Sequence, residues 1–166
     1  NAHAFMAQVQ KLVMAGNIDR ALKLCNAAPS AALPKVVKAG LTRANKGELA
    51  ISNAIEETTL EVVPLIMRRT PALLAIANIA TLLGLLGTIA GLIEAFKQLS
   101  EAPPEQRQEM LGKGISVAMY TTAAGLIVAI PTMLAHLFLS GITKKIVDEI
   151  DQYSVKLENL LVAMSK

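Results

Sequence analysis

The chain has 166 residues, of which 53% are hydrophobic and only 17% are charged, and its formal net charge is +3. Soluble domains carry about 25% charged residues, so this composition indicates contact with lipid. The small, dispersed positive charge gives no support for a nucleic-acid partner, and the single cysteine, Cys25, excludes an internal disulfide and a cysteine metal site.

Residues 1–67 are predicted to form a helical region outside the membrane. The segment AGNIDRALKLCNAAP is typical of two helices joined by a turn, with the turn at Gly16 and a stop near Pro29. A short helix is expected to open at Pro34. A longer one is expected to run from about Glu48 into the apolar block that follows, with Pro64 and Pro71 as candidate kinks.

Two long blocks contain no charged residue: 70–93, with 24 residues, and 114–143, with 30. A helix needs about 20 apolar residues to cross a bilayer, so both blocks are predicted to span it, as helices over 68–97 and 114–143. The alternative is a pair of buried helices in a large soluble protein, but a chain of this length could hardly cover both helices on every side.

Flanking charge predicts the orientation of the two spans. An Arg-Arg pair precedes the first block and a Lys-Lys pair follows the second, whereas the connecting KQLSEAPPEQRQEMLGK balances basic with acidic residues. By the positive-inside rule, 1–67 and the tail 144–166 are cytoplasmic, and the loop 98–113 is periplasmic. The predicted fold class is therefore all-α: an integral membrane helical bundle whose long helices extend into a cytoplasmic helical region.

The tail carries apolar residues at alternating spacings of four and three, the a/d pattern of a helix with one apolar seam. Such a seam can pack against the N-terminal helices of the same chain or against a neighbouring subunit, and the sequence leaves both open. The seam consists of Ile146, Ile150, Tyr153, Leu157, Leu160 and Met164.

Small and hydroxylated residues gather on one face of each predicted span. At 100° per residue, Thr70, Thr81 and Thr88 lie within about 20° of one another on the first span. On the second span, the corresponding residues lie within an arc of about 80°. The first span adds a neighbouring stripe of Gly84, Gly87 and Gly91, and the second-span set is Ala118, Thr122, Gly125, Ala129, Thr132, His136, Ser140 and Thr143.

These faces allow two interpretations. Small residues let helices approach closely in a bilayer, and threonine hydroxyls often bond to carbonyls of their own helix. Alternatively, the hydroxyl stripes on the two helices line a hydrated path. Glu94 is expected to be an interfacial charge at the outer end of the first span, and His136 is expected to serve either as a proton relay or in an interfacial hydrogen bond. Membrane proton relays usually use Asp or Glu, and neither block contains one, so a partner has to supply the carboxylate.

The segments LLGLLGTIAGLIEAF and GISVAMYTTAAGLIVAIPTMLAHLF resemble the two paired spans of the ExbB/TolQ/MotA proton-channel family. The resemblance is closest to the ExbB and TolQ branch, with its GLxGT motif and its TTAxGLxVAIP segment. The preceding NIDRALKLCNAAPSAALPKVVKAGLTRA also resembles the cytoplasmic part of ExbB-like proteins. The family has a further span before its cytoplasmic region, and we expect this chain to be part of a longer protein.

The resemblance implies a multi-pass protein of the bacterial inner membrane with no cofactor beyond the transported H⁺. An enzyme is not expected, because the sequence offers no nucleophile–base pair, phosphate loop or metal-ligand cluster. It implies a homo-oligomer, a pentamer, around two copies of a single-span ExbD/TolR-like subunit whose Asp carries the proton. Thr88 and Thr122 match the two pore threonines of the family. The branch commonly has Glu five residues before the second threonine, where this chain has Val117.

The sequence thus favours a proton-conducting stator subunit that couples the proton-motive force to mechanical work on a partner, embedded in membrane lipid. The predicted pathway residues are Thr88, Thr122, Thr81 and Thr132, and the predicted packing residues are Gly84, Gly87, Gly91 and Gly125. The alternative is a membrane scaffold that packs partner helices through its Gly/Ala faces and conducts nothing. The sequence leaves open whether the ion is H⁺ or Na⁺.

Overall fold

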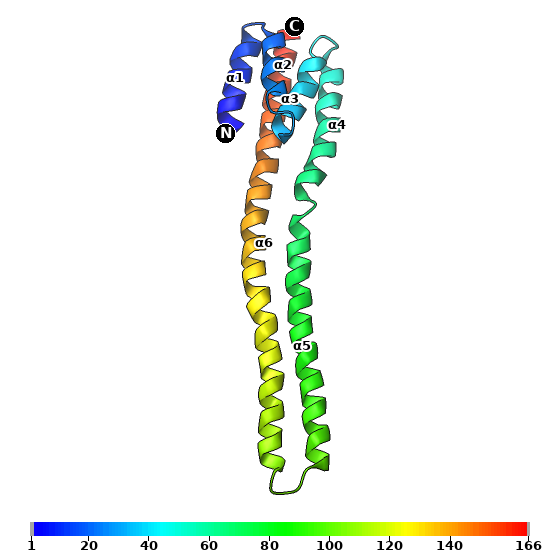
Figure 1. Cartoon of the computed structure of the whole chain (residues 1–166). Coiled ribbons are helices and arrows are strands. Elements are labelled where there is room, and N and C mark those ends of the chain that lie inside the picture. The colour runs from blue at the N-terminus through cyan, green and yellow to red at the C-terminus, as the bar shows by residue number, and fades with distance from the viewer. Residues whose placement is uncertain (1, 166) are drawn as a thin grey trace. The chain divides into compact units, whose positions relative to one another are not determined.

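The computed structural model describes residues 2–165, and the elements found in that stretch are all helices (Figure 1). The prediction of an all-α fold is confirmed. The chain divides into two compact units: a bundle unit, made of the residues up to Arg68 and those from Gly141 on, and a two-helix unit, Arg69–Ser140. The helices are α1 (Ala2–Met14), α2 (Ile18–Asn26), α3 (Ala32–Thr42), α4 (Glu48–Met67), α5 (Thr70–Glu101) and α6 (Arg107–Ser165).

Two glycines shape the turns of the bundle unit. Gly16, between α1 and α2, has φ +72°, and Gly47, before α4, has φ +88°. Residues with a Cβ rarely adopt such angles, so glycine at each position lets the chain reverse direction. The predicted turn at Gly16 is confirmed. The helix expected to open at Pro34 begins earlier, at Ala32, because proline is tolerated in the first helical turn, where its missing N–H has no partner to lose.

The core of the bundle unit brings the tail of the chain onto the N-terminal helices. Side chains of α6 belong to the same buried cluster as side chains of α1, α2, α3 and α4. Gly40 permits a close approach here, since a Cβ at that position would lie 2.9 Å from Ile55 Cδ1. The α6 seam therefore packs within the chain. Its fully buried partners include Met6, Val9, Val13, Cys25, Val36, Val37 and Ile51.

The buried seam of α6 drifts away from the predicted heptad pattern. Ile150 and Leu157 are buried as predicted, whereas Ile146 and Met164, at the two ends of the predicted seam, are 39% and 44% exposed. Leu161 is buried in the position expected for Leu160, which is only half-buried. Three turns of a straight helix take about 11 residues, whereas three turns of a strict heptad pattern take about 10.5. The buried face therefore reaches Leu161 instead of Leu160 three turns after Ile150.

The helix expected to run from Glu48 into the first span, with Pro64 and Pro71 as candidate kinks, is interrupted at residues 68–69. Helix α4 ends at Met67 and α5 begins at Thr70, with Pro71 in its first turn. A proline ring clashes with the carbonyl four residues earlier, which here belongs to Met67, and proline has no N–H to offer that carbonyl. Pro71 therefore explains why the helix stops at Met67.

Helices α5 and α6 lie side by side in the two-helix unit (Figure 1) and are both long and apolar enough to cross a membrane. In the most hydrophobic 18-residue stretch of each helix, only 11% and 6% of the residues are buried, so the leucines and isoleucines face outward. Such a surface is stable in lipid but not in water. The segment predicted as the loop 98–113 contains the end of α5, the connection 102–106 and the start of α6.

Cys25 lies inside the bundle unit at 2% exposure, and burial raises the pKa of its thiol from 9.0 to about 11. Below pH 9, the thiolate fraction should be about 100-fold smaller than in an unfolded chain, because each unit of pKa changes that fraction tenfold. We expect maleimide or disulfide reagents to label Cys25 at least 100-fold more slowly at pH 7.5 in the folded protein than in denaturant. Equal labelling rates would contradict this burial.

Candidate functional site in the two-helix unit

A ladder of small residues brings α5 and α6 together. Gly84 faces Gly125: a Cβ added at Gly84 would lie 3.1 Å from the Gly125 Cα and 3.2 Å from the Thr121 carbonyl oxygen. A Cβ at Gly91 would lie 3.0 Å from the Ala118 Cβ. Without side chains at these positions the two backbones approach closely, which is how helices associate in a bilayer.

The ladder places two threonine hydroxyls against each other. Thr88 on α5 and Thr122 on α6 share a hydrogen bond between their Oγ1 atoms. The Thr88 hydroxyl also lies 3.1 Å from the carbonyl oxygen of Gly84, one turn earlier on its own helix, and 3.4 Å from that of Ala118 on α6. Both side chains are half-buried. The pair therefore bridges the helices in a region without charged residues.

The other predicted pathway threonines bond within their own helices. Thr81 donates to the Ala77 carbonyl at 3.1 Å, and Thr132 donates to the Val128 carbonyl at 2.7 Å. The structure thus brings together Thr88 and Thr122, whereas Thr81 and Thr132 each satisfy a local carbonyl, as threonines in membrane helices often do. Their assignment to the pathway stays a prediction.

Thr121 is a contact residue that the sequence pattern did not single out. Its side chain packs on Gly87, where an added Cβ would lie 2.7 Å from the Thr121 Cβ. Its hydroxyl donates to the Ala118 carbonyl at 2.7 Å. The only signal for it was its position next to Thr122, about 100° around the helix.

The two titratable residues that the sequence singled out, His136 and Glu94, make separate contacts. His136 Nδ1 is 2.9 Å from the carbonyl oxygen of Thr70, so the end of the second charge-free block contacts the beginning of the first. Glu94 is exposed and accepts a hydrogen bond from Gln98 Nε2 at 2.9 Å. Val117 is 58% exposed on α6. None of the three contacts the Thr88–Thr122 pair in the described contacts.

The model of the MotA/TolQ/ExbB proton channel family matches residues 28–152 of this chain, which include all of α5 and most of α6. The chain belongs to this family. Its similarity to ExbB and TolQ is evident in the relatives that follow, and the family consists of transport channels rather than enzymes.

Individual relatives cover parts of the same region. The biopolymer transport protein exbB1 of Vibrio cholerae is 48% identical over 65 residues, which are 39% of this chain and 28% of the relative. The Tol-Pal system protein TolQ of Haemophilus influenzae is 36% identical over 107 residues, 64% of this chain and 42% of the relative. The biopolymer transport protein ExbB of Neisseria gonorrhoeae is 37% identical over 90 residues, 52% of this chain and 40% of the relative.

The chain therefore spans less than half the length of these family members. No solved structure matches it. Within the family context, the bridged hydroxyls are the chemically distinctive feature of the two-helix unit. A hydroxyl can both donate and accept a hydrogen bond, so each member of the pair has the donor for a carboxylate and the acceptor for a carboxylic acid.

Proposed function

We propose that this chain is the proton-conducting stator subunit of an ExbB/TolQ-like motor in the bacterial inner membrane. In this proposal, it assembles as a homo-oligomer, a pentamer, around an ExbD/TolR-like single-span subunit. The proton-motive force then drives mechanical work through that partner. Family membership and the two apolar helices support the channel class and the membrane location.

One observation carries the pathway assignment: Thr88 and Thr122 bridge α5 and α6 through their hydroxyls in a charge-free region. A partner Asp that alternates between COOH and COO⁻ needs a neighbour that can accept a hydrogen bond in one state and donate one in the other. Threonine does both and remains neutral. It also avoids the insertion cost of a charged residue at the centre of a span, about 2.5–3.5 kcal/mol.

The proton acceptor has to come from outside this chain. The blocks 70–93 and 114–143 contain no Asp or Glu, and Val117 occupies the position where the resemblance leads one to expect Glu. An uncharged channel wall without its own carboxylate conducts only when the partner's carboxylate is in place. This supports an obligatory role for the partner in proton transfer.

The proposal is tested by reconstituting the full-length protein into liposomes with and without its single-span partner and measuring pH-gradient-driven proton flux with an internal dye. We expect flux above background only in the presence of the partner, and loss of that flux when the partner's membrane Asp is changed to Asn. A Na⁺ gradient at constant pH serves as the ion control and should drive none.

A second candidate, a membrane scaffold that conducts nothing, is favoured by the small-residue ladder of Gly84, Gly91 and Gly125. Such a ladder explains helix association without any transport. Background flux from an intact complex with its partner would contradict the channel and support the scaffold.

A further inference from the structure

A pocket with a volume of about 380 Å³ lies within the bundle unit, between α4 and α6. We call it the acidic groove. Nine residues line it. Six of them, three with carboxylates, one with a hydroxyl and two apolar, carry the argument that follows: Glu56, Asp151, Glu158, Ser154, Leu60 and Val155.

Ser154 gives the first sign that the groove has an occupant. Its side chain is 7% exposed, and within residues 2–165 its Oγ is the buried side-chain polar atom found without a hydrogen-bond partner. A buried polar group without a partner is destabilising, and each such group calls for an explanation. Ser154 therefore marks this groove as a place where the chain by itself leaves a polar group unsatisfied.

The carboxylates of the groove are also unmatched within the chain. Across the described residues, the ion pair found is that of Lys113 with Glu109, far away in sequence. The nearby Lys156 places its Nζ 5.4 Å from the ring of Tyr153 instead. Residues 48–67 contain four glutamates and neither Lys nor Arg. The groove therefore presents uncompensated negative charge.

The walls of the groove point to a protein partner rather than a metal. Leu60 is 69% exposed and Val155 is 58% exposed, although both lie outside the charge-free membrane blocks. Within the described part of the chain, no group of three or more His, Cys, Asp or Glu side chains is placed to hold a metal ion. Apolar contacts at the centre with polar groups at the rim are typical of protein interfaces.

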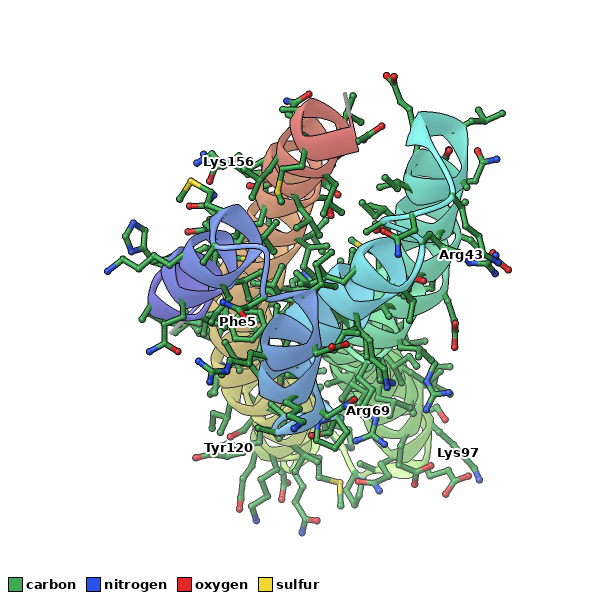
Figure 2. All side chains as sticks on the ribbon, turned by 90° about the horizontal axis from the view of Figure 1, so that it is seen from above. Phe5, Arg43, Arg69, Lys97, Tyr120 and Lys156 are labelled. Atoms are coloured by element: carbon green, nitrogen blue, oxygen red, sulfur yellow. The ribbon has the colours of Figure 1, made fainter. Side chains whose placement is uncertain are left out.

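The complementary charge is present on another surface of the same unit. Residues 2–46 contain seven Lys and Arg residues against a single Asp. Three of them form what we call the basic edge of α3: Lys35 and Lys38 on the helix and Arg43 directly after its last residue, all exposed. Figure 2 shows Arg43 pointing away from the helices. Among residues 2–165, no ion pair is found for any of the three.

We propose that the acidic groove of one copy binds the basic edge of a second copy. The aliphatic stems of Lys35 and Lys38 pack on Leu60 and Val155, and their ammonium groups reach the carboxylates of the groove. The groove and the edge are different surfaces, so the contact is heterologous and repeats from copy to copy, which is how rings form. This inference rests on the homo-oligomer of the proposed function and names the surfaces that build it.

Disulfide trapping tests the contact directly in the full-length protein with its single-span partner. Two differently tagged chains, both carrying Cys25→Ala, are co-expressed, one with Asp151→Cys and the other with Lys38→Cys. We expect mild oxidation to give a covalent dimer that carries both tags, because the two thiols come from different copies. Chains with Asp148→Cys instead of Asp151→Cys are the matched control, since Asp148 is exposed on α6 but does not line the groove.

Charge exchange tests the energetics. Reversing the groove (Asp151→Lys with Glu158→Lys) or the edge (Lys35→Glu with Lys38→Glu) should weaken self-association at least about tenfold at physiological salt, because like charges would meet at the contact. Both reversals in one chain should restore it. Glu57→Lys with Asp148→Lys changes the net charge equally outside the groove and should leave association unchanged. Slow labelling of Cys25 verifies that each of these variants is folded.

Two results would overturn the inference: an intact oligomer without the mixed disulfide, or failure of the double reversal to restore association lost in the single reversals. Release of the single-span partner alone by the groove reversal would also overturn it, since the groove would then bind that partner. Proton flux is a separate readout. A wild-type complex that forms the mixed disulfide but conducts nothing contradicts the proposed function and leaves this contact standing.

Discussion

A chain in which Thr88 and Thr122 are both replaced with valine is expected to assemble with its partner but to lose proton-driven activity. Valine has nearly the shape of threonine, so the packing of α5 on α6 persists, whereas the two bridging hydroxyls disappear. A hydrogen bond to a charged group contributes about 1.5–3 kcal/mol. Each 1.4 kcal/mol changes a rate tenfold, so we expect the flux in proteoliposomes to fall at least about tenfold.

Two variants separate the hydroxyl from the side-chain shape. Thr121→Val removes a hydroxyl from the neighbouring position, where it donates to the Ala118 carbonyl of its own helix, and should leave the flux close to that of the wild type. Serine at both Thr88 and Thr122 keeps the hydroxyls and should retain most of the flux. Wild-type flux in the double valine variant would eliminate the hydroxyl pair from the mechanism.

Gly125→Ala is expected to destabilise the two-helix unit by about 1–3 kcal/mol, the usual cost of overpacking. The new Cβ would lie 2.8 Å from the Ala80 carbonyl oxygen and 2.9 Å from the Gly84 Cα, and neither backbone atom can move aside cheaply. The higher helix propensity of alanine than of glycine stabilises the helix by at most about 1 kcal/mol. Overpacking therefore dominates, and the thermal unfolding midpoint in detergent should fall.

Gly141→Ala is the matched control on the same helix. A Cβ there meets nothing within 4 Å, so only the helix-propensity gain remains and the midpoint should stay or rise slightly. Gly125→Leu should be more severe than Gly125→Ala and prevent accumulation of the folded protein. A stable Gly125→Leu variant would contradict the close approach of α5 and α6.

Much of the fold could be predicted because local signals agree with it. The two long helices follow from charge-free blocks of more than 20 residues. The first turn follows from Gly16, which has positive φ, and the start of α4 follows from an acidic residue. Each of these signals depends on nearby residues alone. Pro64 and Pro71 were both candidate kinks, but the sequence did not indicate that the first is accommodated inside α4 and that only the second coincides with a break. Which proline breaks and which is tolerated depends on packing that the local sequence does not contain.

The candidate site was only partly predictable. Helical periodicity placed Thr88 and Thr122 on the small-residue faces, but it could not tell which threonine of each helix meets the other. The register of α5 against α6 decides that, and it follows from Gly84 meeting Gly125. Thr121 escaped attention because its contribution is shape against Gly87 rather than position on the hydroxyl stripe. The acidic groove depends on residues about 100 positions apart and had no sequence signal at all.

The link between His136 and Thr70 has a consequence for how α5 and α6 are held together. A backbone carbonyl can only accept, so Nδ1 carries the hydrogen of this bond, and in the neutral ring the lone pair lies on Nε2. The bond joins the first residue of α5 to a side chain of α6, far along the chain from the 102–106 connection. The two helices are therefore tied to each other at both ends of the pair, by a covalent connection at one end and by this hydrogen bond at the other.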